Sequence, residues 1–466
     1  RRAYWKGVNE AETRGVAPPP HAFGAGGHDF VGWLCEPVSS TAVPRHLAAY
    51  WETRSDLMRN FPDPLGGDGP GLQRWASTDE GYRRTVPVAL QAAPVAGDVV
   101  KGVNLVGYHA GQFGVGEAGR LIAKIVRAAG VPTATTTLYP PEHTHAAVPR
   151  TGMTGAPFDY SIFTMNADGL MGFAGSPEFR AHTGHRVGVW AWEAGLLPPS
   201  MRSASHLVDE VWCATDYVQS LLAPVIDRPV RKHPLVIDVP TIRTALQRSD
   251  LGLPEAHFLF GFAFDYASVL ERKNPLGLID AYCDAFGPED GAALVLKTLN
   301  ALRHPMVASA LHHAADRRPD IVVLDQPLPA VEMRALFQLL DCYVSLHRAE
   351  GTGLTMTAAM AAGTPCVATG WSGNLEFMTE ENSMLVPYEL VEVGRSADPY
   401  APDAVWAEPD LSAAAAAMRS LFDDREAALA LGARGRASIA SLHNAGRAAA
   451  WFMKQFDSPS ARTVAA

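Results

Sequence analysis

The alternation of short, continuous apolar runs with amphipathic segments constrains the fold of this chain more than any other feature, and it occurs twice in succession. The runs of strand length are 103–109, 160–166, 186–192, 210–215, 229–237, 258–265, 293–299, 321–325 and 342–347. Segments with helical periodicity separate several of them, for example 275–286 and 331–340. Continuous apolar strands that alternate with helices are typical of parallel sheets covered on both faces. The pattern therefore predicts two successive doubly wound α/β units.

The same pattern divides the chain into four parts. Residues 1–99 combine a loose arm with short helical stretches such as 44–58 and form a small, mostly helical N-terminal region. Residues 100–240 and 241–440 are the two doubly wound domains, and 441–466 is a C-terminal helix that we expect to cross back to the first domain. Two such domains form a ligand cleft where the carboxyl ends of their strands face each other.

The composition excludes several classes of function. The chain has 39 Lys and Arg residues against 49 Asp and Glu, so its net charge of −10 gives no general attraction to nucleic acid or anionic membrane. No apolar run reaches the length of about 18 residues that a transmembrane helix needs. Residues 1–15 are not a secretory signal, and their opening Arg-Arg suggests a start inside a longer protein. The five cysteines are widely spaced without a CxxC pair, which predicts free thiols and a cytoplasmic location.

The densest concentration of functional signals lies in residues 347–378, where a strand is followed by a glycine-rich turn and a helix. Gly351 and Gly353 allow the backbone to approach a ligand, and a helix that begins near Leu354 offers free N–H groups to a phosphate. Glu350 lies on the same turn, where its negative charge would repel a phosphate. A carboxylate at that place is explained if it accepts hydrogen bonds, for example from sugar hydroxyls. The alternative is that Glu350 is an ordinary surface residue of the turn and that the glycines only allow the chain to bend there. The spacing alone does not distinguish a binding site from such a turn.

A second candidate site is the basic pair Arg272–Lys273. Asn274 is predicted to cap a helix whose first residue is Pro275, so the two cations lie just before a helix N-terminus. Cations at that place oppose the helix dipole, and an anion between them and the helix would explain them. Arg as a fork and Lys as a point charge suit a diphosphate. The alternative is a pair of solvated surface cations.

The third candidate is the turn that contains Gly114 and Gly116 and opens a helix after the strand 103–109. No further glycine follows at the dinucleotide-binding spacing, and Glu117 puts negative charge on the first turn, so a nicotinamide site fits poorly. A turn whose backbone lies against a ligand held by the other domain fits better. A simple tight turn is the alternative.

Several single residues at strand ends are further candidates. His109 follows the first strand and can reach the cleft to bind substrate, or it is a satisfied histidine at the cleft edge. Asp168 and Glu193 follow apolar strands and can orient an acceptor hydroxyl. The alternative is that they are loop residues without a functional role. Trp190 and Trp192 point to one face of their strand, where core packing is the default and a platform for sugar stacking the lesser interpretation.

A metal site is not predicted. His143 and His145 form an H-x-H pair in a proline-rich loop, but Glu142 is the one carboxylate nearby and no cysteine accompanies them. This donor set falls short of the clusters that hold a metal ion.

These residues resemble the family-4 retaining glycosyltransferases of the GT-B fold, and a bacterial subgroup of them in the N-terminal half. The resemblance covers roughly residues 100–455. It is carried by Glu350 to Thr355, Gly363–Thr364–Pro365, Ser372–Gly373–Asn374, Arg272–Lys273, the GYH…GVGE segment, Asn166–Ala167–Asp168 and VWAWE at 189–193. It implies two facing Rossmann-like domains, a nucleotide-sugar donor, transfer with retention of anomeric configuration, and neither a metal nor another cofactor.

The resemblance also implies roles for particular residues. Glu350 would bind hydroxyls of the donor sugar, the N–H groups from Gly351 to Leu354 would contact sugar and phosphate, and the Arg272–Lys273 pair would stabilise the leaving diphosphate. The donor-binding set is Gly114, Gly116, Gly351, Thr352, Gly353, Leu354, Thr355 and Asn374, and the catalytic set is Glu350, Arg272, Lys273, His109 and Asp168.

The sequence departs from the family pattern in three places. Ala358 replaces the second Glu that usually holds the ribose, and Thr352 replaces an aromatic residue between the turn glycines. Asp265 and Tyr266 stand where a further basic residue often precedes the cation pair. The identity of the donor nucleotide therefore stays open.

The sequence predicts a glycosyltransferase that moves a sugar from a nucleotide-diphosphate sugar to a hydroxyl of a glycan, a lipid-linked or a small-molecule acceptor. One alternative is a catalytically impaired glycan- or nucleotide-binding module on the same scaffold, which Ala358 and Thr352 favour and the Glu350–Arg272–Lys273 set opposes. Another is a two-domain enzyme such as a nucleotide-sugar epimerase, which would need no acceptor.

Overall fold

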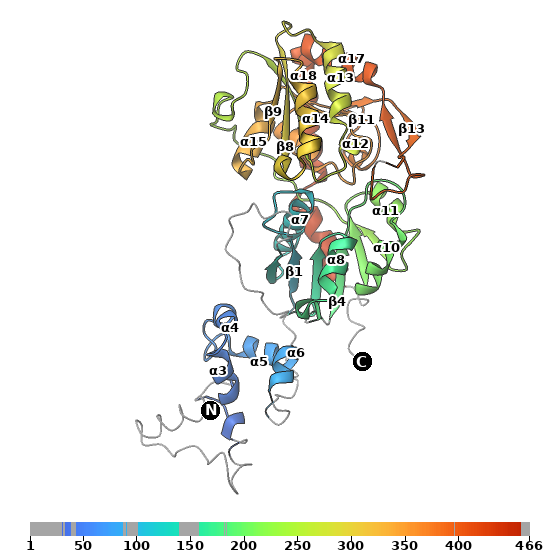
Figure 1. Ribbon diagram of the computed structural model, residues 1–466. Coiled ribbons are helices and arrows are strands. Elements are labelled where there is room, and N and C mark those ends of the chain that lie inside the picture. The colour runs from blue at the N-terminus through green and yellow to red at the C-terminus, as the bar shows by residue number, and fades with distance from the viewer. Residues whose placement is uncertain are drawn as a thin grey trace.

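The computed structural model describes most of the chain. The described residues are 30, 33–38, 43–86, 90, 101–138, 158–180, 182, 184–395 and 397–457. Figure 1 shows two α/β halves one above the other, with the small helical region beyond the first half. The fold class expected from the sequence is confirmed, because each half contains a six-stranded parallel sheet with helices around it.

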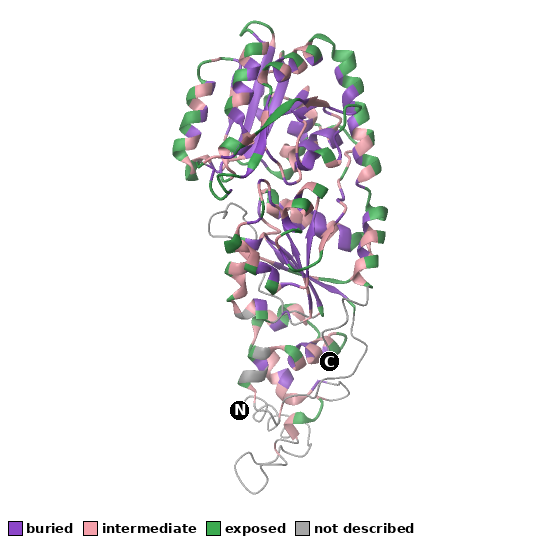
Figure 2. Cartoon of the chain, turned by 90° about the vertical axis from the view of Figure 1, so that its right-hand side faces the viewer, coloured by how far each residue is buried: buried purple, intermediate pink, exposed green. Residues whose placement is uncertain are grey.

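The first half is built on the sheet β2-β1-β3-β4-β5-β6, in which every neighbouring pair is parallel. Its strands are β1 (Val103–Gly107), β2 (Thr133–Thr137), β3 (Tyr160–Thr164), β4 (His185–Val189), β5 (Glu210–Cys213) and β6 (Val230–Lys232). The helices between them are α7 (Gly114–Ala128), α8 (Ala167–Ala174), α9 (Pro177–Arg180), α10 (Pro199–Arg202) and α11 (Asp216–Leu222). Strands β1, β3 and β5 are buried along their whole length, and burial on both faces explains their continuous apolar runs (Figure 2).

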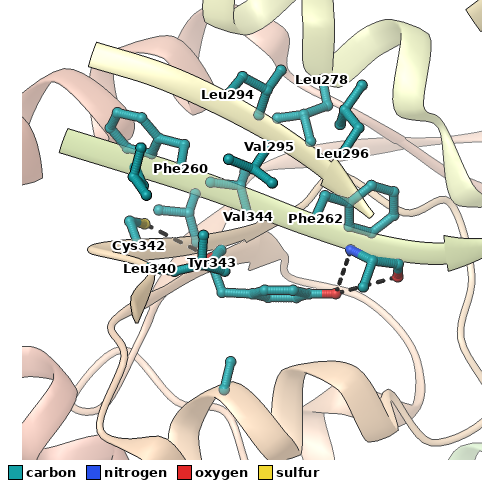
Figure 3. Packing of buried hydrophobic residues seen from close by; sticks show 14 of the residues in the cluster. Phe260, Phe262, Leu278, Leu294, Val295, Leu296, Leu340, Cys342, Tyr343 and Val344 are labelled. Atoms are coloured by element: carbon teal, nitrogen blue, oxygen red, sulfur yellow. Dashed lines mark hydrogen bonds between the residues drawn. The ribbon is translucent and has the colours of Figure 1, made fainter. Parts of the chain in front are cut away.

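The second half is built on the parallel sheet β12-β11-β10-β7-β8-β9. Its strands are β7 (Phe258–Asp265), β8 (Ala292–Leu299), β9 (Ile321–Leu324), β10 (Cys342–Ser345), β11 (Cys366–Thr369) and β12 (Met384–Val386). Its helices are α12 (Leu270–Lys273), α13 (Pro275–Ala285), α14 (Pro305–Ala315), α15 (Ala330–Leu339), α16 (Leu354–Ala362), α17 (Leu411–Asp423) and α18 (Arg425–Leu442). Figure 3 shows side chains of β7, β8 and β10 packed together, with the Tyr343 hydroxyl on the backbone of Ala263.

The small N-terminal region has a core of its own. It contains α3 (Arg45–Trp51), α4 (Ser55–Asn60), α5 (Gly69–Thr78) and α6 (Glu80–Thr85). Leu47, Leu72 and Tyr82 are among the buried residues of this core. The helical stretch predicted for 44–58 is interrupted after Trp51, where the Thr53 hydroxyl donates a hydrogen bond to the Tyr50 carbonyl, 2.6 Å away, and ends the first helix.

The sequence pattern missed an antiparallel hairpin late in the second half. It consists of β13 (Tyr388–Glu392) and β14 (Val405–Pro409), and residues 393–404 connect the two strands. We call residues 393–404 the arm. Tyr400 of the arm is buried in the same apolar cluster as Trp190 and Trp192 of the first half. The arm therefore belongs to the second half by sequence but packs on the first.

Helix α19 (Ala445–Phe456) also follows the second half in sequence and packs on the first. The rings of Trp451 and Trp212 of β5 meet edge to face, with their centroids 4.9 Å apart. Phe452 is completely buried in the core that β1 and α7 form. Figure 1 shows this red helix among the elements of the first half. None of the helices in the described ranges combines the length and apolar character of a membrane-spanning segment.

Candidate functional site

The cation pair lies where one short helix ends and the next begins. Arg272 and Lys273 are the last residues of α12, and Asn274 caps α13, as predicted, by accepting a hydrogen bond from the Gly277 N–H. Asn274 adopts a left-handed conformation (φ 52°), and its Nδ2 donates to the Leu346 carbonyl at 2.9 Å. The pair thus ends a helix as well as preceding one, so its position is less unfavourable than the sequence suggested.

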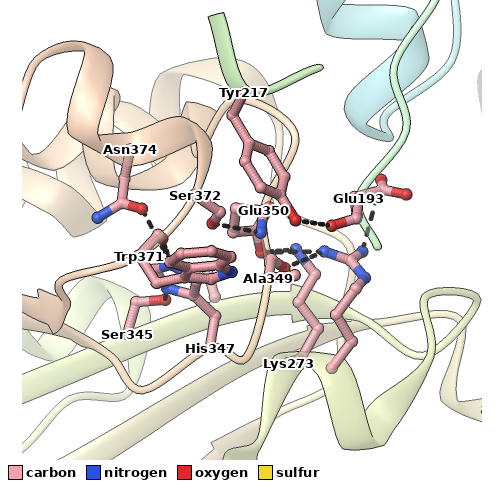
Figure 4. A network of polar contacts seen from close by, with 12 residues as sticks. Glu193, Tyr217, Lys273, Ser345, His347, Ala349, Glu350, Trp371, Ser372 and Asn374 are labelled. Carbon is pink, nitrogen blue, oxygen red and sulfur yellow. Dashed lines mark hydrogen bonds and ion pairs between the residues drawn. The ribbon is translucent and has the colours of Figure 1, made fainter. Parts of the chain in front are cut away.

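Glu350, which follows the neighbouring strand β10, forms ion pairs with both cations. Its Oε1 forms an ion pair with the Lys273 ammonium and lies 3.4 Å from Nη1 of Arg272. The side chains of Arg272, Lys273 and Glu350 are 5%, 15% and 13% exposed. Two sites that the sequence analysis treated separately are therefore one buried charged cluster (Figure 4).

The cluster shifts the pKa values of its members in different directions. Burial alone would raise the pKa of Glu350, but the charges of Lys273 and Arg272 outweigh it and lower the pKa to about 2. Burial lowers the pKa of Lys273, although Glu350 counteracts it. Burial also disfavours the charge of Arg272, but the neighbouring Tyr400, Glu193 and Glu350 raise its pKa overall. Glu350 is therefore ionised at neutral pH and opposes the two cations.

The turn after Glu350 needs glycine for two different reasons. Gly353 precedes α16 in the left-handed region (φ 80°). Gly373 lies against the turn from the other side, where a Cβ atom would be 2.1 Å from the Gly351 carbonyl oxygen. No described side chain caps the first turn of α16, so no cap competes with an anion for its N–H groups. Thr352, Leu354 and Thr355 are partly exposed beside it.

Asn374 lies below this turn and does not face outward. It is completely buried, its Oδ1 pairs with Nε2 of His347 at 3.1 Å, and its Nδ2 donates to the Thr369 carbonyl at 3.0 Å. His347 also contacts Ser345 and the Trp371 carbonyl, and burial is the main cause of its lowered pKa. Asn374, predicted to bind the donor, is thus placed to support the turn from beneath.

The turn at the start of α7 gives mixed support to its predicted role. Gly116 is required by the chain itself, since a Cβ atom would lie 2.5 Å from the Gly111 carbonyl oxygen. Gly114 is exposed and has open space around it, which leaves room for a ligand. Burial lowers the pKa of His109 to about 4, with a further contribution from Arg120, so its ring is neutral at pH 7.

The two carboxylates proposed for the acceptor side lie in different surroundings. Asp168 is exposed on the first turn of α8 and is not part of the charged cluster. Glu193 is part of it, because its Oε1 lies 3.8 Å from Nη2 of Arg272. Its Oε2 accepts a hydrogen bond from the Tyr400 hydroxyl at 2.8 Å. Trp190 and Trp192 are buried in the core, as the default interpretation predicted.

A second polar cluster, which was not predicted from the sequence, lies at the carboxyl ends of β8 and β9. The Lys297 ammonium is buried and donates to the Thr298 carbonyl, and the Thr298 hydroxyl donates to Asp325. His312 lies 2.6 Å from the same carboxylate. Burial lowers the pKa of Lys297 to about 8, against the opposing effect of Asp325 and Asp265. A lysine inside a mostly apolar strand was the one signal in the sequence for this cluster.

The expectation that no metal is required stays a prediction. The described residues contain no group of three His, Cys, Asp or Glu side chains arranged to hold a metal ion. His143 and His145 lie outside the described residues.

The comparisons with known proteins concern the fold of the chain and one segment of its second half. Its fold is that of the GT-B glycosyltransferases, and residues 290–396 match the model of Glycosyl transferases group 1. HepE of Anabaena in complex with UDP and glucose is similar, with a TM-score of 0.57 and 14% identity over 76% of this chain and 99% of that one. Sucrose-phosphate synthase from Thermosynechococcus elongatus is similar with a TM-score of 0.55 and 15% identity, over 76% and 98% of the two chains. No curated protein matches the sequence.

Proposed function

We propose that the chain is a glycosyltransferase that moves a sugar from a nucleotide-diphosphate sugar to a hydroxyl acceptor, with retention of configuration and without a metal. The observation that carries this proposal is the buried cluster of Glu350, Arg272 and Lys273 beside the uncapped first turn of α16. A ligand with sugar hydroxyls and a diphosphate matches it, because a carboxylate accepts from hydroxyls while cations and helix N–H groups bind phosphate.

The strand order supports an extended ligand along one edge of the second sheet. Glu350 follows β10, the cation pair follows β7, Lys297 lies near the end of β8 and Asp325 follows β9. These four strands are consecutive neighbours in the sheet. Neighbouring strands lie about 4.8 Å apart. A donor would therefore lie with its sugar at Glu350, its diphosphate at Arg272 and Lys273, and its nucleoside toward Lys297 and Asp325.

The proposed mechanism assigns each step to residues of this chain or to the donor. Arg272 and Lys273 stabilise the negative charge that grows on the diphosphate as the bond to the anomeric carbon breaks. The acceptor oxygen forms its bond on the face from which the diphosphate leaves, and the leaving phosphate oxygen takes the acceptor proton. In this scheme the cation pair and the dipole of α16 neutralise the diphosphate in place of a metal ion.

The neighbouring structures support a uridine nucleotide, since HepE is complexed with UDP and glucose and, in another structure, with UDP-glucose. Ala358 packs partly buried against the core of the second half, so it supplies no group for the ribose. We propose that the ribose is held from elsewhere. The acceptor class, a bacterial origin and a cytoplasmic location stay predictions.

The first experiment is a thermal-shift panel of UDP, GDP, ADP and dTDP, with and without EDTA, on the wild type and on Lys273→Ala. We expect one nucleotide to raise the melting temperature selectively, EDTA to have no effect, and the variant to lose the shift. A shift that EDTA abolishes would contradict metal independence, and the absence of any shift would favour a binding module without transfer activity.

A second experiment separates glycosyl transfer from epimerisation of the donor. The selected nucleotide-sugar, labelled in the sugar, is incubated with the protein, and the products are resolved. Release of labelled sugar or its attachment to an added acceptor supports transfer. Conversion of the donor to an epimer without release supports a nucleotide-sugar epimerase.

A further inference from the structure

Glu193 links the acceptor-side half to the cation pair of the other half. It follows β4 in the first half, and its Oε1 lies 3.8 Å from Nη2 of Arg272. Two tyrosines fix it, because the Tyr400 hydroxyl donates to Oε2 at 2.8 Å and the Tyr217 hydroxyl donates to the Glu193 carbonyl at 2.6 Å. Figure 4 shows Glu193 pointing toward the charged cluster from the opposite side to Glu350.

The arm holds Tyr400 at this place from both halves. Ala404 packs so closely on the first half that a Cβ atom at Gly195 would be 2.6 Å from its methyl group. At the base of the arm, the Ala407 N–H donates to the Arg348 carbonyl at 2.9 Å, and Glu408 accepts two hydrogen bonds from the Arg348 guanidinium. The Tyr400–Glu193 contact is therefore a built feature and not a chance approach of two surface side chains.

The charges of the cluster balance in the absence of a donor. Arg272 and Lys273 carry two positive charges, and Glu350 and Glu193 carry two negative ones. A diphosphate adds negative charge, so it competes with the two carboxylates for the cations. One of the existing ion pairs then has to break. The contact between Arg272 and Glu193 is the weaker one, since 3.8 Å exceeds hydrogen-bond distance, whereas Lys273 is in direct contact with Glu350.

We propose that Glu193 is a positioning residue that serves as the counter-ion of Arg272 until the diphosphate replaces it. Once released from Arg272, the Glu193 carboxylate, still held by Tyr400, accepts the hydrogen bond of the acceptor hydroxyl. Donor binding then precedes acceptor binding, because the carboxylate that orients the acceptor is occupied until the diphosphate has arrived. The proposal rests on the proposed function, since it assigns the diphosphate to Arg272.

The test measures the affinity for the nucleoside diphosphate that stabilises the wild type, UDP in the first instance, by calorimetry at fixed ionic strength. Glu193→Gln removes a charge that competes with the ligand for Arg272, so we expect UDP to bind about tenfold more tightly. Transfer at saturating donor should fall in the same variant, because a neutral amide accepts a hydrogen bond from the acceptor hydroxyl more weakly than a carboxylate does. Glu193→Asp keeps the charge and should restore an affinity close to that of the wild type.

The matched control is Glu376→Gln. Glu376 also pairs across the two halves, with Lys232 of β6, but it is not part of the Arg272 cluster. Removal of its charge should leave the affinity for UDP unchanged, which separates the specific exchange from a general effect of net charge. Melting temperatures of both variants show whether they are folded.

The outcomes distinguish the inference from the proposed function. If the wild type binds no nucleoside diphosphate, the proposed function fails and the inference fails with it. If the wild type binds UDP but Glu193→Gln binds it equally or more weakly, or Glu376→Gln binds it just as tightly as Glu193→Gln, the inference alone is overturned. Tighter binding in Glu193→Gln together with a lower rate supports it, since loss of a purely structural contact would weaken both.

Discussion

The side chain of Glu350 has two neighbours of opposite charge in a place that water hardly reaches. A buried ion pair contributes little over an apolar replacement of the same shape, but removal of one partner leaves an uncompensated charge. The Glu350–Lys273–Arg272 cluster is therefore sensitive to single changes and tolerant of paired ones. This asymmetry yields the first prediction.

Glu350→Gln should lower the free energy of unfolding by about 3 kcal/mol, because Lys273 and Arg272 then lack a buried counter-ion. The double variant with Lys273→Met should recover part of that loss. Urea denaturation of the wild type, both single variants and the double variant checks this. Additive losses in the double variant would show that the two side chains do not interact.

The lowered pKa of Glu350 predicts how acid acts on the fold. Its pKa falls from an ordinary value of 4.5 to about 2 in the native protein, so its contribution to stability is complete above pH 4.5 and is lost as the pH falls toward 2. The stability difference between wild type and Glu350→Gln should therefore shrink between pH 5 and about pH 2. Urea midpoints of both proteins across this range measure it, and a constant difference would contradict the prediction.

Lys297 has a predicted effect on nucleotide binding at higher pH. Its pKa of about 8 means that its positive charge, and any attraction to an anionic ligand, is present below that pH and disappears above it. The affinity for UDP should fall by several-fold between pH 7 and pH 9 in the wild type. Lys297→Met should bind weakly at both pH values, and calorimetry at each pH tests this. If the affinity of the variant for UDP falls between pH 7 and pH 9 as much as that of the wild type, a group other than Lys297 causes the pH dependence.

Among the structural elements, the turn–helix unit around α16 was predicted well and the hairpin was not. Helix α16 begins at Leu354 as expected. Gly353 and Gly363 adopt left-handed conformations at its two ends and mark them locally in the sequence. Tyr400 and Glu193, by contrast, are 207 residues apart in the chain. Their contact depends on how the arm packs on the other half, which no local pattern records.

Gly373→Ala tests whether the turn depends on the close approach of two loops. The added methyl group would lie 2.1 Å from the Gly351 carbonyl oxygen, so the turn that carries Glu350 has to move. We expect transfer activity to fall at least tenfold with a smaller change in melting temperature. Gly114→Ala is the control, since a Cβ atom there has open space, and it should stay close to wild type in stability.

At the scale of the whole molecule, the two-sheet architecture could be predicted from the sequence because buried parallel strands read as continuous apolar runs. The charged cluster was predicted as separate pieces, since β7 and β10 are neighbours in the sheet but about 80 residues apart in the chain. The contact between Glu193 and Arg272 could not be predicted, because it depends on how one half is placed against the other.

Removal of α19 should damage the half that is farther from it in sequence. Trp451 and Phe452 cover the first sheet at Trp212, and their loss would expose an apolar face. A chain that ends at residue 442 should show loss of protection from hydrogen exchange in β1 and β5 ahead of β7 and β8. Equal protection in both sheets would contradict this prediction.

The position of α19 also has a consequence for synthesis. A ribosome completes the strands of the first sheet long before it reaches residues 445–456, so the nascent first half has no helix to cover Trp212 while the second half is made. The second half has all of its own strands and helices earlier. We therefore expect the half that is translated second to become stable first, and the half that is translated first to stay open to chaperones and proteases until residues 445–456 have been made.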